Sequence, residues 1–197
     1  MSYADGNITI GTSVDMYGIN EGLTKIENSF RKLKKLSYGA FGIIAIAKFQ
    51  RAALDAASSL VEVQNVVDVA FGDMEYKMER FANISVKQFG MSELAAKQTG
   101  GAYMEMGKAL GLDAETASNM AIKLTALTGD FASFYNISQD YARVALSAVY
   151  TGETETLKRY AIVITKANLQ EFAAAHGIEK KVSAMTSAEK TMLRYQY

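Results

Sequence analysis

The fold is decided by Ala114–Ala161, AETASNMAIKLTALTGDFASFYNISQDYARVALSAVYTGETETLKRYA. Apolar and small residues recur in its first half at steps of three and four, the spacing of one face of an α-helix. This predicted inward face consists of Ala117, Met120, Ala121, Leu124, Leu127, Phe131 and Phe134. Asp113 is the expected N-cap and Asn136 the expected end, which gives about six turns and a length of about 33 Å.

The second half of the same stretch predicts two more helices. Ser138 is the expected N-cap of the first of them and Gly152 its end, and Thr154 is expected to start a third, shorter helix. The inward residues are expected to be Tyr141, Val144, Ala145 and Ala148, followed by Leu157 and Tyr160. Tight connections between these helices predict a helical hairpin with an added turn.

The composition also favours helices over a turn-rich β architecture. The 197 residues include no proline, and 49% of them are hydrophobic and 21% charged, which is typical of a globular chain. The absence of cysteine excludes disulfides and thiolate metal sites. Because 21 Lys and Arg residues balance 21 Asp and Glu residues, no net positive field attracts nucleic acid, and we expect no direct nucleic-acid binding.

The N-terminal part of the chain is expected to form a separate segment. Asn7–Thr12 alternates weakly and predicts one short strand at most, and Asp15–Lys35 predicts a helix. The basic residues at the end of that helix, Arg31 to Lys35, suit a solvated helix C-terminus better than a phosphate-contacting patch. We place an N-terminal strand and helix segment at residues 1–37 and a helical domain at residues 38–197.

The remaining residues predict helices that end at glycines. Gly39–Ala70 is expected as a long helix ending at Gly72, although its many β-branched valines also fit a strand. Asp73–Lys87 and a helix capped by Ser92 follow, with Gly100-Gly101 marking a bend or close packing. The expected inward residues are Ala57, Leu60, Val61, Val67, Phe71, Met74, Met78, Phe81, Ile84, Ala95, Thr99, Ala102, Met106 and Ala109.

The C-terminal region predicts two further helices. Thr165 is expected to cap the first, which carries Leu169, Phe172, Ala173 and His176 on one side and ends at Gly177. Thr186 and Glu189 form a predicted capping box for the second. Together these patterns predict an all-α, multi-helix bundle of about seven to nine helices.

Residues that usually carry chemistry are few and scattered. His176 is the only histidine, and its place beside a helix-ending glycine favours a structural role. Without cysteine or a second histidine, zinc, haem and Ser-His-Asp arrangements lack components. Glu153 and Glu155 are two positions apart and point in different directions on a helix, which does not suit an acid/base pair. We expect no catalytic residue, no metal, no cofactor and no small-molecule substrate.

Several short motifs occur in the order typical of one protein family. They are Ala56–Val66, Phe71-Gly72, Phe89-Gly90, Gly111-Leu112, Asp130–Asn136, Ser147–Leu157, Ala174 with Gly177-Ile178, Glu189-Lys190 and Arg194-Tyr195. In this order they resemble the N-terminal region of phage tail tape measure proteins, over roughly residues 53–197. The residues to which the resemblance gives a structural role are Gln64, Asn65, Phe71, Gly72, Asp130, Phe134, Tyr135, Asn136, Gly152, Glu153, Leu157 and Lys158.

The resemblance implies a non-enzymatic, structural component of a phage or prophage tail. Tape measure proteins occupy the tail tube and set tail length during assembly in the bacterial host cytoplasm, after which they belong to the virion tail. The implied partners are the tail tube protein, tail assembly chaperones, distal tail proteins and further copies of the chain. Because a helix rises about 1.5 Å per residue, a tail on the order of 1,000 Å needs on the order of 700 residues. We therefore expect this chain to be an N-terminal segment truncated at its C-terminal end.

Two other interpretations remain open. In the first, a helical membrane-active or pore-forming protein inserts Phe41–Ala47 and the glycine pairs into a bilayer after a conformational change. The apolar window that holds these residues, Ala40–Ala47, is much shorter than the roughly twenty residues that span a membrane. In the second, a helical adaptor binds a partner helix.

Overall fold

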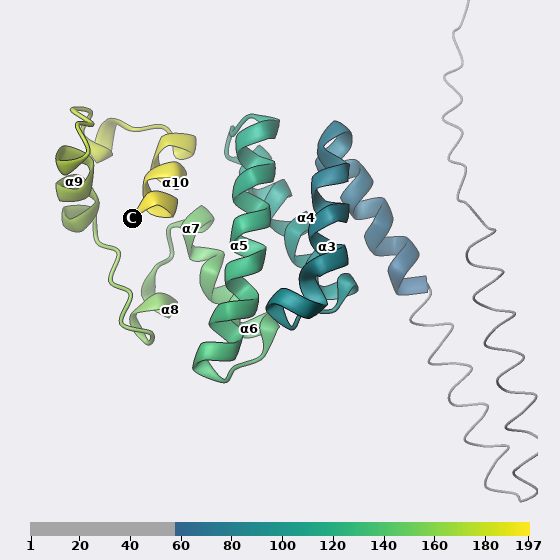
Figure 1. Cartoon of the computed structure of the whole chain (residues 1–197). Helices are drawn as coiled ribbons and strands as arrows, with labels where there is room; N and C mark the ends of the chain where they lie inside the picture. Colours follow the sequence, from purple (N-terminus) through teal and green to yellow (C-terminus); the bar gives the residue numbers. More distant parts are fainter. Residues whose placement is uncertain (1–57) are drawn as a thin grey trace, which may run out of the picture. The chain divides into compact units, whose positions relative to one another are not determined.

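The structure, a computed structural model, describes residues 58–197 (Figure 1). Of these residues 79% are helical and none forms a strand, so the predicted all-α bundle is confirmed for the described part of the chain. The strand predicted at Asn7–Thr12, the helix at Asp15–Lys35 with its basic end, the window Ala40–Ala47 and the boundary after residue 37 lie outside the described residues.

Short connections join the helices. A helix at residues 58–71 comes first, and helix rather than strand is therefore the correct prediction for this valine-rich segment. It is followed by η1 (Gly72–Met74), α3 (Glu75–Phe89), α4 (Glu93–Ala109), α5 (Ala114–Tyr135), α6 (Gln139–Leu146), α7 (Ala148–Thr151), α8 (Glu155–Lys158), α9 (Lys166–Ala175), η2 (Val182–Ala184) and α10 (Ser187–Gln196).

Most predicted helix ends are confirmed. The side chains of Ser92, Asp113, Ser138 and Thr165 each accept a hydrogen bond from a first-turn backbone N–H, and Thr186 with Glu189 forms the predicted capping box. At the C-terminal ends, Gly90, Asn136 and Gly152 adopt positive φ angles of 62°, 51° and 79°, the left-handed geometry that stops a helix. Thr154 precedes α8 as predicted, but its hydroxyl donates to the Ile164 carbonyl at 2.9 Å and does not accept from the helix.

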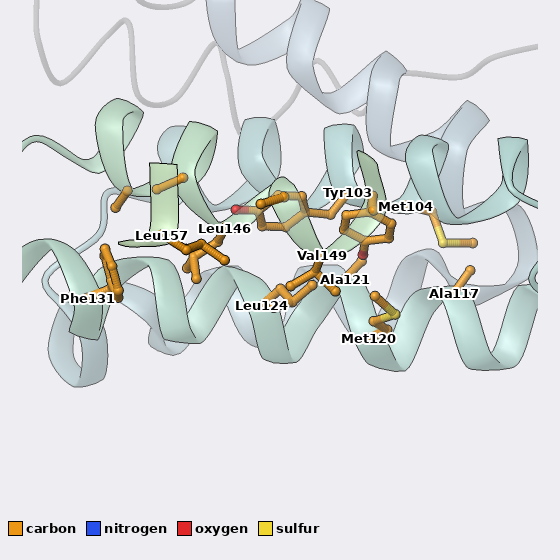
Figure 2. Packing of buried hydrophobic residues seen from close by; sticks show 14 of the residues in the cluster. Tyr103, Met104, Ala117, Met120, Ala121, Leu124, Phe131, Leu146, Val149 and Leu157 are labelled. Carbon is orange, nitrogen blue, oxygen red and sulfur yellow. The ribbon is translucent and has the colours of Figure 1, made fainter. Parts of the chain in front are cut away.

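The core lies between α5 and its neighbours α4, α3 and α6. In Figure 2 the labelled side chains of α5 point to one side, toward Tyr103 and Met104 of α4 and Leu146 and Val149 of α6 and α7. The α5 residues buried in this core are Ala117, Met120, Ala121, Leu124, Phe131 and Ala132, and all but Ala132 belong to the predicted face.

The prediction is wrong for Leu127 and Phe134, which are 44% and 81% exposed. Thr125 and Thr128 are fully buried in α5 instead, and their hydroxyls donate to the carbonyls of Ala121 and Leu124 at 2.7 and 2.8 Å. A hydroxyl bonded to its own helix leaves mainly the methyl group to pack. The inward face therefore runs through two residues that look polar in the sequence.

Other predicted faces are rotated in the same way. Ser85 replaces Ile84 as a buried residue of α3, and Tyr103 and Met104 are buried in α4. Residues predicted inward but exposed in the structure are Leu60, Val61, Ile84, Ala109, Tyr141, Val144 and His176, whereas Met74, Ala95, Ala102, Met106, Tyr160 and Phe172 are half-buried. Ala57 lies outside the described residues. The helix predicted from Ser138 to Gly152 is divided at Ser147 into α6 and α7.

Glycines within helices mark close packing. A Cβ atom at Gly101 would lie 2.9 Å from Val66, and one at Gly100 would meet the flexible end of Met78. At Gly129 of α5 the added Cβ would lie 2.7 Å from the backbone oxygen of Phe89, which cannot move without shifting α3. The prediction of close packing at Gly100-Gly101 is thus confirmed.

Gly100 lies against a flexible side chain and Gly129 against the backbone of α3, so replacing each glycine by alanine should have different effects. Gly129→Ala should lower the free energy of unfolding by about 1–3 kcal/mol, because the new methyl group overlaps the backbone of α3. Gly100→Ala is the matched control. There the end of Met78 can move aside, and the roughly 1 kcal/mol gain in helix propensity offsets the crowding. Urea unfolding of both variants measures the difference, and equal effects would contradict it.

Candidate functional site

The motif at the C-terminal end of α5 forms an aromatic cluster. The ring centroids of Phe131, Tyr135 and Tyr160 lie 4.6 to 4.7 Å apart in each pair, within the range of favourable ring contacts. The Tyr135 hydroxyl donates to the backbone oxygen of Tyr160 at 3.1 Å. Phe134 contacts Tyr135 at 4.9 Å but stays at the edge of the cluster. The cluster therefore fastens the end of α5 to the segment that follows α8.

A second contact joins Gly152 to the last helix. Arg194 of α10 donates from Nε to the Val149 carbonyl at 2.7 Å and from Nη2 to the Tyr150 carbonyl at 2.8 Å. These carbonyls belong to α7, where the helix dipole favours a cation. A Cβ at Gly152 would lie 3.3 Å from the guanidinium, so a side chain there would crowd Arg194. We call this contact the Arg194 latch.

A third cluster surrounds Lys97 of α4, which is only 5% exposed. Its ammonium lies 2.9 Å from Glu79, 3.0 Å from Glu93 and 2.7 Å from the side-chain oxygen of Gln64. Gln64 in turn donates to Asp68 at 2.8 Å. The Lys97 cluster therefore links the helix at residues 58–71 to α3 and α4.

The charges of this cluster fit a buried ion network. Burial lowers the pKa of Lys97, but hydrogen bonds and charges from Glu79 and Glu93 outweigh it, so the net pKa is raised above its ordinary value. Burial, together with the charges of Asp68 and Glu79, raises the pKa of Glu75. Lys97 therefore stays charged at neutral pH, as a structural cation requires, and is not available as a base.

The other motif residues occupy helix ends, the core or the surface. Phe71 and Leu157 are buried, whereas Asn65, Asp130 and Glu153 are exposed. Lys158 pairs with Glu155 at 2.7 Å on the surface of α8, and Gly72 has a positive φ of 52°. The structure thus brings Gln64, Tyr135 and Gly152 into contacts with distant segments but does not gather the twelve residues into one site.

Two buried tyrosines lie in the core between α4 and α7. Tyr103 and Tyr150 stack at 5.6 Å, and the Tyr103 hydroxyl bonds to Thr128 and to the Arg143 carbonyl. The Tyr150 hydroxyl is buried without a hydrogen-bond partner in the described residues. Burial raises the pKa of Tyr103 to about 12 and also raises that of Tyr150. Both phenols are neutral at physiological pH, and their rings act as packing groups.

Two further places in residues 58–197 hold titratable side chains, the end of α9 and a cleft between α4 and α6. His176 is exposed, stacks on Phe172 at 4.0 Å and bonds to its carbonyl through Nδ1 at 2.8 Å. No group of three or more acidic or histidine side chains in this part of the chain could hold a metal ion. A cleft of about 580 Å³ between α4 and α6 contains one charged pair, Asp140 and Arg143, 3.7 Å apart.

No helix in the part of the chain that the structure describes has the length and apolar character needed to cross a membrane. Phe41–Ala47, the segment of the membrane-active interpretation, lies outside that part.

Sequence reasoning missed the Lys97 cluster entirely. The only local signal was Glu93, four positions before Lys97, which is a common surface pair on helices. Gln64 lies 33 positions before Lys97, and nothing in the spacing connects them. Arg194 and Gly152 were both noted in the resemblance, but their contact depends on how α10 packs on α7.

Removing the guanidinium of Arg194 should weaken the attachment of α10 to α7 without unfolding the rest of the chain. Arg194→Met should leave the two α7 carbonyls with fewer partners and raise the population of states in which α10 is detached, by about tenfold. Chymotrypsin cleavage after Phe172 measures that population. Arg159→Met, which removes an exposed arginine, is the control and should leave the cleavage rate unchanged. Equal rates in both variants would show that the latch contributes nothing.

No family model, no curated protein and no solved structure matches the chain.

Proposed function

We propose that the chain is the N-terminal region of a phage or prophage tail tape measure protein. The observation that carries the proposal is the ordered series of motifs between residues 53 and 197, which resembles that family throughout its length. In the proposed role the protein occupies the tail tube, sets tail length during assembly and catalyses no reaction.

The contacts of the motif residues support a structural role. Tyr135 closes the aromatic cluster, Gly152 leaves room for Arg194, and Gln64 accepts a hydrogen bond from Lys97. Each of these contacts joins segments that are distant in sequence. Residues that hold helices together are expected to be buried or to end a helix. Phe71 and Leu157 are buried, and Asn136 ends α5.

The proposed partners follow from the same resemblance. They are the tail tube protein, tail assembly chaperones, distal tail proteins and further copies of the chain. The protein would be assembled in the bacterial host cytoplasm and would remain in the virion tail.

Deleting the gene in the phage or lysogen that encodes it tests the proposal. Electron microscopy should show tails that are absent or irregular in length, and a plasmid copy of the intact gene should restore them. If the gene continues past Tyr197, removing about 70 downstream codons should shorten tails by about 105 Å, because a helix rises about 1.5 Å per residue. Tails of normal length in the deletion strain would overturn the proposal.

A vesicle-leakage measurement distinguishes the membrane-active alternative from the proposed tail function. The purified chain should leave dye-loaded vesicles of neutral and acidic phospholipids intact at neutral pH if it acts in tails. Leakage, combined with normal tails in the deletion strain, would favour a pore-forming protein.

A further inference from the structure

One face of α5 carries large and charged side chains that the bundle does not use. Lys123, Leu127, Asp130 and Phe134 follow one another at steps of four, three and four, so they line up along the helix. Leu127 is 44% exposed and Phe134 81% exposed. Lys123 and Asp130 are exposed and take part in no ion pair within residues 58–197. We call these four residues the α5 stripe.

Packing within the bundle does not account for the stripe. The Phe134 ring contacts only the edge of the aromatic cluster, at Tyr135, and Leu127 lies outside the buried core. Steps of four, three and four are the spacing at which one helix presents a seam to another helix. The stripe therefore has the form of a helix–helix contact surface.

The charges make the stripe complementary to itself in one direction. Lys123 lies four residues before Leu127, and Asp130 lies three residues after it. In an antiparallel pair with Leu127 against Leu127 of a second copy, each Lys123 comes within about 1.5 Å, measured along the axis, of Asp130 of the other copy. In a parallel pair, Lys123 would face Lys123 and Asp130 would face Asp130, which is unfavourable.

We propose that the α5 stripe is the interface of a homodimer in which two α5 helices pair antiparallel about a two-fold axis at Leu127. Because the contact is isologous, the pair of Lys123 in one copy with Asp130 in the other forms twice. Phe134 then lies over the segment of the second copy that contains Asn119 and Lys123, where the lysine stem can cover the ring. The contact is short and its ion pairs are exposed, so the dimer is weak. The proposal does not rest on the tail function, because it follows from the face of α5 alone.

Single cysteines report the direction of pairing cleanly, since the chain contains no cysteine of its own. Under mild oxidation Leu127→Cys should form a disulfide-linked dimer, because the two positions meet at the axis. Phe134→Cys should not, because its copies lie about 21 Å apart along an antiparallel pair, beyond the reach of a disulfide. Val69→Cys, at a 75% exposed site on the helix at residues 58–71, controls for random collision.

Charge reversal tests the contact without cysteines. Sedimentation equilibrium of the full chain from about 10 µM to about 1 mM should show a monomer–dimer equilibrium. Lys123→Glu should raise the dissociation constant about tenfold, and adding Asp130→Lys should return it to within about threefold of the original value. Val69→Ser should leave it unchanged, and circular dichroism checks that each variant is folded.

Three outcomes would overturn the proposed antiparallel dimer. A chain that stays monomeric over the whole range has no such interface. A double variant as weak as Lys123→Glu, or cross-linking of Phe134→Cys as fast as that of Leu127→Cys, excludes the antiparallel pairing. These measurements use only the purified chain, so their result is independent of the deletion experiment. Absence of a dimer would overturn the interface but not the tail function, and normal tails in the deletion strain would overturn the tail function but not the interface.

Discussion

The close approach of α4 and α5 is the constraint on which the rest of the described structure depends. The two helices meet over small residues, where a Cβ at Gly107 would lie 3.1 Å from Ala117. Tyr103, Met104 and Met120 are buried beside this contact, all on the same side of Ala117 along α5. α3 and α6 pack onto this pair, and a change that pushed α4 and α5 apart would open a cavity through the whole core.

The C-terminal helices are attached to that pair more loosely. α9 and α10 reach the bundle chiefly through the contact of α10 with α7, at the far end of the arrangement in Figure 1. The Arg194 latch supplies directional hydrogen bonds there, beside buried apolar residues of the same core such as Leu193 and Val149. Two motif residues, Gly152 and Arg194, therefore lie where α10 is connected to α7.

Sequence reasoning succeeded for features set by neighbouring residues. The Asp113 side chain accepts from the N–H of Thr116, and such a cap needs only three residues to be in place. It was only partly correct for the faces of helices, where Leu127, Phe134 and Ile84 are exposed, because burial depends on what packs against them. Thr125 and Thr128 look polar in the sequence, but each hydroxyl donates to a carbonyl of its own helix, so both side chains can be buried without a further hydrogen-bond partner. The Lys97 cluster could not be predicted, because its partners come from three helices.

We infer that the other helices are assembled on the pair formed by α4 and α5. Native-state hydrogen exchange of the full chain, followed by mass spectrometry, measures the opening of each helix directly. We expect amides at the contact of α4 and α5 to exchange last, only through global unfolding, and those of α9 and α10 to exchange earlier as one unit. Protection of α9 and α10 equal to or greater than that of α4 and α5 would contradict it.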